Sequence, residues 1–483
     1  MTGLREVWCG TPSRKTRKWC AAPYVEVDCD RVGLGPPGTT PRAMKLLSIL
    51  VLAALVGAHQ EEESSDAPSV VLELTHGPFL AHVDSTEVNL WMRASRPGAF
   101  TVSARPMFEP LAEPIVVRQS ASVEQDLTLS FRIAGLMPGT AYDCEVSCDG
   151  AALDHRRVQT PFLGTSKARI VFGSCADERR FPHHGVWDAI LGRDPDALVL
   201  LGDTPYIDST ELEHQRERYR EFLEVESLAT LLRSTPTYNT WDDHDFGRND
   251  TNGLLEGREY SRQAFVEYHA GPQFGSDGEG IFTSFRRGPV EVFLIDARWF
   301  AWREDSIAAP GSKSLLGAAQ WTWLTEGLEA SDAPFKVLAS GMIWNGATRP
   351  GKPDHWGSYT AERDALFRFI GDKQITGVVL VGGDIHRSRV VEHATTESAG
   401  YPLTELISSP MANTVMEIAN APHPGLKWDA GLMHTFLELE VDAVGERQRL
   451  VARFRTQDGK VHHEVVLQGS DLGAVRAGAE SPR

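Results

Sequence analysis

Five strand-like stretches of this sequence share one feature: each of them ends in side chains that can bind a metal ion. The stretches are ARIVFGSC, DALVLLGDTPY, TYNTWDDHD, VEVFLIDAR and VVLVGGDIH. Apolar runs of this kind are typical of buried strands in α/β sheets, and ligands gather beyond the carboxyl ends of such strands. The repetition therefore predicts an active site along one edge of a layered sheet.

Helical segments separate these strands. Stretches between residues 187 and 373 repeat apolar residues with the period of a helix and alternate with the strands. This alternation predicts a layered α/β domain of about 300 residues. The segment 435–467 has the pattern of a β-meander with a turn at Asp458-Gly459, and we expect it to extend a second sheet.

A different pattern precedes this domain. From Val70 to about Thr160, short alternating strands are separated by turn residues at a spacing near ten residues, which predicts a β-sandwich of about 90 residues. The stretch GLMPGTAYDCEV, in which a loop is followed by Tyr142, is typical of a fibronectin-III-like (Fn3-like) sandwich. We interpret Trp91 and Tyr142 as core aromatic residues.

The amino-terminal segment suggests export. Residues 44–58, MKLLSILVLAALVGA, combine a lysine, an apolar run and small residues, as a secretory signal peptide does. A membrane anchor is the rival interpretation, but a run of about 14 apolar residues is short against the roughly 20 that span a bilayer. We expect translation to start at Met44, which makes residues 1–43 an upstream mis-start or a disordered leader. Residues 59–68 are then an acidic linker, and residues 471–483 a loose tail.

Charge and cysteine content limit the partners. The net charge of −18 argues against nonspecific binding to nucleic acid or to an anionic membrane surface. We expect a monomer without a permanent membrane span, located in the periplasm, at the cell surface or outside the cell. Cleavage after residue 58 leaves Cys144, Cys148 and Cys175, an odd number that suggests another role for one thiol. Cys144 and Cys148 lie too far apart on one strand for a disulfide.

Two motifs concentrate carboxylates. Asp203 follows a buried strand and precedes Tyr206 by three residues, although an Asp at this point can also cap the next helix. The stretch TWDDHDFGRND places six polar groups after a strand, namely Asp242, Asp243, His244, Asp245, Asn249 and Asp250. Crowded carboxylates repel one another unless a cation or protons compensate, and carboxylate with His suits a metal beside an acid or base.

The last motif completes the predicted site. Asp384 and His386 face the same side of an extended segment, and the two glycines before them allow close backbone approach, to an ion for example. Cys175 is either a thiolate ligand or a nucleophile that needs a partner such as His183. We favour the ligand, because carboxylates with Tyr and Cys suit an oxidised iron, while the remaining oxygens suit calcium or magnesium.

Taken in their order along the chain, the motifs resemble those of the PhoD-like family, the alkaline phosphatase D group of metallophosphoesterases. The matching segments are FGSC, GDTPY, WDDHDFGRND, LIDAR, HWGSYTAER and GGDIH. The resemblance covers roughly residues 70–470. It implies an Fn3-like β-sandwich over residues 69–162, followed by an α/β metallophosphatase domain with four αββα layers over residues 163–470.

The resemblance also implies roles for individual residues. A ferric ion would be bound by Cys175, Asp203, Tyr206 and His386. Asp203 would bridge to one or more calcium ions, or another divalent metal, that Asp243 and Asp384 also bind.

Other positions of the motifs are assigned by the same resemblance. His244 takes the general-acid position, and Asp242 or Asn249 are alternatives to Asp243. Arg298 either contacts phosphate or pairs with a carboxylate. Arg248 stands where many relatives have Asn or Pro.

We therefore expect a secreted enzyme that hydrolyses phosphate monoesters, diesters or both with a metal-activated water. A phospholipase D-type phosphodiesterase acting at the same metals is the nearest alternative. Two alternatives from other classes are a catalytically inactive, metal-stabilised binding protein and a thiol hydrolase that uses Cys175 and His183.

Overall fold

The structure, a computed structural model, describes residues 72–182 and 185–473. The predictions for residues 1–43, 44–58 and 59–68, and for the tail beyond residue 473, lie outside these ranges. All described residues belong to one structural unit. No helix within the two described ranges is long and apolar enough to cross a membrane.

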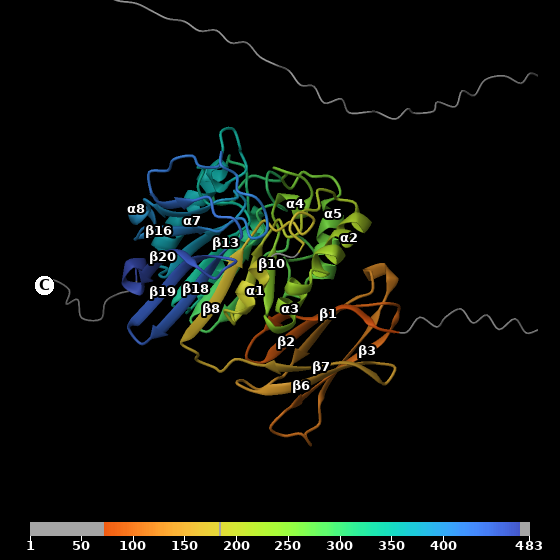
Figure 1. The fold of residues 1–483 in the computed structure, drawn as a ribbon. Coiled ribbons are helices and arrows are strands. Elements are labelled where there is room, and N and C mark those ends of the chain that lie inside the picture. Colours follow the sequence, from red (N-terminus) through yellow and green to blue (C-terminus); the bar gives the residue numbers. More distant parts are fainter. Residues whose placement is uncertain (1–71, 183–184, 474–483) are drawn as a thin grey trace, which may run out of the picture. The chain divides into compact units, whose positions relative to one another are not determined.

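Two antiparallel sheets share a hydrophobic core in the amino-terminal part (Figure 1). One sheet has the order β1 (Leu74–Val83), β2 (Glu87–Ala94), β5 (Thr128–Ala134). The other has the order β4 (Ile115–Ala121), β3 (Gly98–Pro106), β6 (Ala141–Cys148), β7 (Ala151–Gln159). The short helix η1 (Val123–Gln125) joins β4 to β5. Phe100 and Phe131 from opposite sheets are fully buried in this core, and Tyr142 is buried with them.

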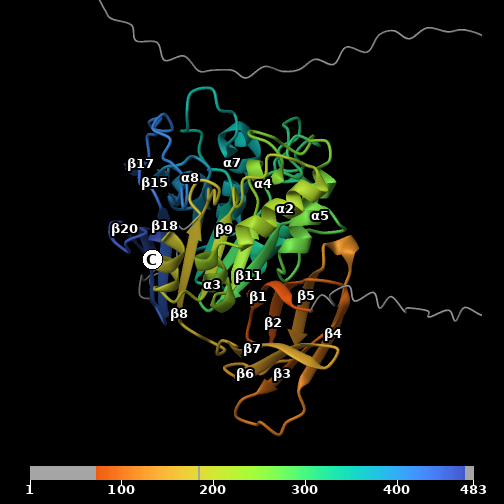
Figure 2. The same cartoon turned by 45° about the vertical axis from the view of Figure 1, so that its right-hand side comes forward.

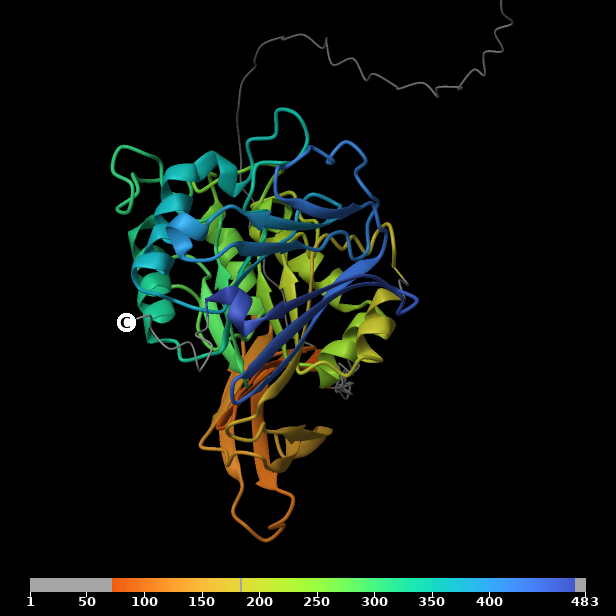
Figure 3. The ribbon, with the colours of Figure 1, turned by 90° about the vertical axis from the view of Figure 1, so that its left-hand side faces the viewer.

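A six-stranded sheet carries the first predicted motifs. Its order is β10 (Thr237–Thr240), β9 (Ala197–Leu201), β8 (Lys167–Gly173), β18 (Thr435–Val444), β19 (Arg447–Thr456), β20 (Val461–Gln468). Strands β8, β9 and β10 are parallel, and β18, the first strand of the meander that is blue in Figure 3, runs antiparallel to β8. The predicted meander therefore forms, but it extends the sheet of β8 rather than a second sheet, because β18 pairs directly with β8.

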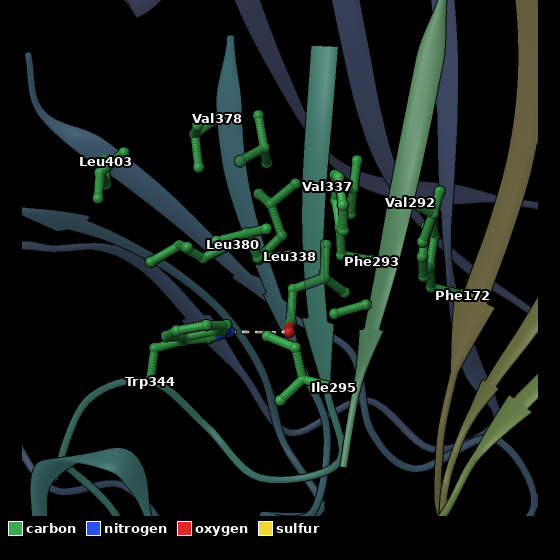
Figure 4. Close-up of a cluster of buried hydrophobic side chains, with 14 of the residues drawn as sticks. Phe172, Val292, Phe293, Ile295, Val337, Leu338, Trp344, Val378, Leu380 and Leu403 are labelled. Atoms are coloured by element: carbon green, nitrogen blue, oxygen red, sulfur yellow. Dashed lines mark hydrogen bonds between the residues drawn. The ribbon is translucent and has the colours of Figure 1, made fainter. Parts of the chain in front are cut away.

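A seven-stranded sheet carries the remaining motifs. Its order is β11 (Thr283–Arg287), β12 (Val290–Ile295), β13 (Phe335–Ser340), β14 (Val378–Gly382), β16 (Leu403–Ile407), β15 (Ser388–His393), β17 (Leu426–Ala430). Strands β12, β13, β14 and β16 are parallel. Figure 4 shows the apolar side chains of this sheet packed together, with Trp344 Nε1 donating to the carbonyl of Val381 at 3.1 Å.

Helices cover the outer faces of both sheets. The first sheet packs against α1 (Val186–Leu191), α2 (Leu212–Leu223), α3 (Glu226–Ser234) and α5 (Arg258–Tyr268). The second packs against α6 (Gly317–Ala330) and α7 (Thr360–Asp372). Alternate residues of β8 divide between the two sides, since Val171 joins the cluster with the helices and Ile170 joins the core between the sheets. The layers are therefore helix, sheet, sheet, helix.

The amino-terminal sheet β1–β2–β5 packs on α3 and α5 (Figure 2). Trp91 Nε1 donates to the carbonyl of Glu267 at 2.8 Å, and Asn89 Nδ2 donates to the carbonyl of Ala270 at 3.2 Å. His82 Nδ1 lies 2.9 Å from the Tyr238 hydroxyl on β10. These contacts attach the amino-terminal sheet to the end of α5 and to β10.

Candidate metal centre

Four of the predicted ligands share an unusual backbone conformation. Cys175 after β8, Asp203 after β9, and Asp384 and His386 after β14 have φ values of 60°, 53°, 67° and 53°. Residues other than glycine rarely adopt this left-handed region, which costs on the order of 1 kcal/mol or more each and recurs at functional sites. The backbone turns sharply where each strand ends, and this places the side chains of both sheets at one edge.

Glycines at these strand ends allow the chain segments to approach one another. A Cβ atom on Gly202, whose φ is +93°, would lie 2.2 Å from the backbone nitrogen of Asp242. A Cβ atom on Gly383 would lie 2.5 Å from the Ser174 hydroxyl oxygen. The expected close approach before Asp384 is therefore to a neighbouring strand end of the protein.

The first ligand group contains sulfur, nitrogen and oxygen donors. One atom each from Cys175, Asp203 and His386 lie within 4.8 Å of one another. The Tyr206 hydroxyl is 2.8 Å from His386 Nε2, and His386 Nδ1 is 2.6 Å from the carbonyl of Thr414. Because a carbonyl can only accept, Nδ1 carries the proton, and the Nε2 lone pair faces the group, as in many metal-binding histidines.

Asp203 and Asp243 connect this group to others that hold more carboxylates. Asp203 lies with Asp243 and His244 in a second group, and Asp243 lies with Asp242 and Asp384 in a third. The next helix, α2, begins at Leu212 with Glu211 as its cap, so Asp203 does not cap it. The predicted metal ligands are thus brought together at the seam between the two sheets.

A fourth group adds residues that the motifs left without a role. Asp243 lies with Asp250 and Asp354 within the same 4.8 Å limit, and the backbone nitrogen of Asp250 donates to Asp243 at 2.6 Å. Lys352 Nζ is 2.6 Å from Asp384 Oδ1. Asp250 lies within the motif WDDHDFGRND, and Asp354 directly precedes the motif HWGSYTAER. These positions in the sequence could have identified both residues as candidate ligands. Lys352 has no such signal.

His244 is held by the loop that follows β9. Its Nδ1 lies 2.5 Å from Asp208 Oδ1, and the backbone nitrogens of Ile207 and Asp208 donate to its carbonyl at 3.0 and 2.9 Å. Burial lowers the pKa of His244, but the hydrogen bond to Asp208 and the charges of Asp203 and Asp243 outweigh it and raise that pKa to about 10.

The electrostatics of the donors reflect their crowding. Burial, with Asp384 nearby, raises the pKa of Cys175 to about 12. Burial, followed by the charges of Cys175 and Asp243, raises the pKa of Asp203 well above its ordinary value. Burial also acts on Asp243, but Arg298 and Lys352 outweigh it and lower the pKa of that carboxyl. These anionic donors are too close to ionise together without a compensating cation.

Arg298 is fully buried and uses all of its donors within the protein. Its five N–H groups make two bonds to Asp242, two to Asp354 and one to the carbonyl of Thr251. No donor is left for a phosphate oxygen. Of the two alternatives for Arg298, the structure therefore supports pairing with carboxylates.

The donor sets fit metal ions. Four buried carboxylate oxygens of the ligand groups have no hydrogen-bond partner among the described residues, namely Asp242 Oδ2, Asp243 Oδ1, Asp250 Oδ1 and Asp384 Oδ2. Buried polar atoms are rarely left in this state, because each costs free energy. The thiol, imidazole and phenol of the first group suit a transition metal, and the carboxylate group suits a hard cation such as calcium.

Some motif residues lie outside these groups. Asp296 accepts hydrogen bonds from Trp241 Nε1 at 2.7 Å and from the backbone nitrogens of Ile281 and Arg298, so it supports the fold. Asn249 is exposed. His183, the proposed partner of a nucleophilic Cys175, lies outside the described residues, and the burial of Cys175 is unlike that of a reactive thiolate.

Comparison with known proteins identifies the family and the fold of the chain. A family model described as PhoD-like phosphatase matches residues 170–441, more than half of the chain. Alkaline phosphatase D of Bacillus subtilis (strain 168) is 28% identical over 209 residues, which are 37% of this chain and 35% of that protein. The matched segment therefore spans about a third of the curated relative's length.

Two solved structures share the fold. The structure of PhoD has a TM-score of 0.65 at 17% identity, covering 84% of this chain and 92% of that one. A purple acid phosphatase from yellow lupin (Lupinus luteus) seeds has a TM-score of 0.60 at 12% identity, covering 83% and 77%. Both likenesses support a metallophosphatase-like fold. Taken with the matched family model, they place this chain in the PhoD-like phosphatase family.

Proposed function

We propose that this protein is a metal-dependent phosphoesterase that hydrolyses phosphate monoesters, diesters or both. One observation carries the proposal: Asp203 and Asp243 connect a group with thiol, imidazole and carboxylate donors to a group with carboxylates only. Two chemically different donor sets that share carboxylates suit two different metal ions side by side. Membership of the family supports a phosphate ester as the substrate.

The residues divide between two metals in this proposal. Cys175, Asp203, Tyr206 and His386 would hold a ferric ion. Asp243 and Asp384 would hold calcium or another divalent ion, and Asp203 belongs to donor groups on both sides. When bound, these metals polarise the phosphoryl oxygens and lower the pKa of the attacking water.

His244 and Asp208 complete the chemistry from the protein side. Asp208 binds the Nδ1 proton of His244, which leaves Nε2 to donate a proton to the leaving alcohol oxygen. Asp208 is a positioning residue in this account, because it acts through the imidazole. The ring of His244 is also fixed by Tyr206, whose ring centroid lies 4.5 Å away.

The amino-terminal domain is Fn3-like in the same proposal. Support comes from its two sheets of three and four strands and from Tyr142, whose hydroxyl accepts from the backbone nitrogen of Met137 at 2.8 Å. We further propose a monomer, and, on the basis of residues 44–58, its export to the periplasm, the cell surface or the outside of the cell.

Hydrolysis assays on an aryl monoester, a bis-aryl diester and a phospholipid test the function and distinguish the phospholipase D-type alternative. We expect Asp203→Asn and His386→Ala to lose bound metal and about 10³-fold or more in kcat/KM, because each removes a ligand. Asp332→Asn, at a side chain that is 96% exposed, is the control. A metal-loaded protein that hydrolyses none of the three esters, or ligand variants with full activity and unchanged metal content, would contradict the proposal.

A further inference from the structure

We infer that Lys352 supplies a cation to the site from within the chain: its ammonium group occupies a cation position between Asp384, Asp250 and Asp354, and a divalent ion that binds there displaces it. The inference rests on the proposed metal site. It adds a residue that competes with the metal and links metal loading to the loop that carries it.

The contacts of Lys352 are those of a bound cation. Its Nζ lies 2.6 Å from Asp384 Oδ1, 3.4 Å from Asp250 Oδ1 and 3.8 Å from Asp354 Oδ2. The lysine side chain is only 5% exposed, and those of Asp384 and Asp354 are 6% and 9% exposed. A lysine is rarely buried to this extent unless it is paired. Here three carboxylates surround one ammonium group.

This position overlaps the ligand groups. Asp384 belongs to the group with Asp242 and Asp243, while Asp250 and Asp354 belong to the other group that contains Asp243. Lys352 uses Asp384 Oδ1, and Asp384 Oδ2 has no hydrogen-bond partner among the described residues. A divalent ion on Asp384 would therefore lie close to the ammonium, and two like charges at such a distance repel.

Charge balance favours the metal in this competition. Five carboxylates, those of residues 242, 243, 250, 354 and 384, face three cationic side chains, Arg298, Lys352 and Arg349, which leaves two formal negative charges. Replacing the single charge of Lys352 with a double charge offsets one of them. The ammonium also regains its hydration when it leaves, because it is a compact and strongly hydrated cation.

The chain around Lys352 can accommodate its departure. Lys352 lies in the segment 341–355 between β13 and η2 (Trp356–Tyr359), outside any helix or strand. Its neighbours Gly351 and Pro353 are exposed. Arg298 cannot leave in the same way, since it is fully buried and bonded through all five donors. Of Lys352 and Arg298, Lys352 is thus the cation that a metal ion can displace.

Calcium titration by calorimetry into the full-length protein tests the competition. We expect Lys352→Met, which keeps the length of the side chain and removes its charge, to bind Ca²⁺ about tenfold more tightly than the wild type or better. Lys352→Arg should stay near the wild-type affinity. The control is Lys373→Met, at an exposed lysine paired with Glu329, and it should change nothing. Equal or weaker Ca²⁺ binding by Lys352→Met would overturn the inference.

Hydrogen exchange of residues 346–355 gives a second readout in the wild type and in Lys352→Met. Exchange should become faster when Ca²⁺ is added, because Lys352 no longer anchors the segment, and in Lys352→Met it should be fast with and without Ca²⁺. Slower exchange in the Ca²⁺-loaded wild type would overturn the inference.

If metal binds and exchange responds as expected but no ester is hydrolysed, the proposed function fails and this inference stands. Hydrolysis with unchanged affinity and exchange would overturn this inference and leave the proposed function intact.

Discussion

At the scale of single residues, the site combines strain with crowding. Four candidate ligands have positive φ values, and buried carboxylate oxygens of Asp242, Asp243 and Asp384 lack hydrogen-bond partners among the described residues. Both features cost stability in the metal-free protein. We therefore expect metal binding to stabilise the fold, since an ion that binds only the native state shifts the folding equilibrium.

Asp208 gives a prediction about leaving groups. Asp208→Ala removes the acceptor that orients His244, so hydrolysis of an alkyl phosphate ester should slow by about 10- to 100-fold. A dinitrophenyl ester has a leaving group that needs no proton, and its rate should change little. Steady-state kinetics on both esters measure the difference. Equal losses on the two substrates would show that Asp208 does not act through proton donation.

Arg298 gives a prediction about stability. Arg298→Met leaves Asp242 and Asp354 buried without their partner, so the free energy of unfolding should fall by about 3–5 kcal/mol. Urea denaturation of the metal-free protein measures this change. Arg132→Met is the control, because that arginine is 68% exposed and solvent screens its pair with Glu87, so the free energy of unfolding should change little. Unchanged stability with a raised KM would instead assign Arg298 to phosphate binding.

At the scale of secondary-structure elements, the buried strands are the most predictable part. Continuous apolar runs locate β8, β9 and β14 together with the ligands at their ends. Within the region of helical period, the continuous stretch 211–234 forms two helices, α2 and α3, which are separated at Val225, where no Gly or Pro marks the break. The sequence of β4, IVVRQSA, alternates only weakly between apolar and polar residues, so this pattern alone does not predict a strand there.

The site residues that the sequence does not reveal lie in loops. Asp208 and Lys352 lie in loops several residues from any strand end or helix, so only the folded chain brings Asp208 to His244 and Lys352 to Asp384. The role of Arg298 is also open in the sequence, because its partners Asp242 and Asp354 are each 56 residues away. Distances of this kind depend on how two sheets pack, which no local pattern encodes.

The end of α5 gives a prediction about pH. Burial lowers the pKa of His269 to about 4, and its ring packs on Phe265 with centroids 4.2 Å apart. The fold thus favours the neutral ring, whereas the unfolded chain protonates near pH 6.5. This contribution to stability is complete above about pH 6.5 and declines as the pH falls toward 4, by up to about 3 kcal/mol. The Tm of His269→Gln should therefore fall less between pH 7 and pH 5 than that of the wild type; an equal fall would contradict this.

At the scale of the whole molecule, the site depends on both sheets. Cys175, Asp203 and Asp243 follow strands of the six-stranded sheet, while Asp384 and His386 follow a strand of the seven-stranded sheet. The chain is acidic, with a net charge of −18, and bound metals would supply the positive charge that an anionic ester requires. We therefore propose that donors from the two sheets hold iron together.

The visible absorption spectrum of the iron-loaded protein, with and without Tyr206→Phe, tests this claim most directly. A tyrosinate bound to ferric iron absorbs visible light, so the wild-type protein should be coloured. Tyr206→Phe should lose this band while iron stays bound through Cys175, Asp203 and His386. The control Tyr260→Phe, at a residue that is 53% exposed, should keep it. A colourless iron-loaded wild type, or an unchanged band in Tyr206→Phe, would contradict the account.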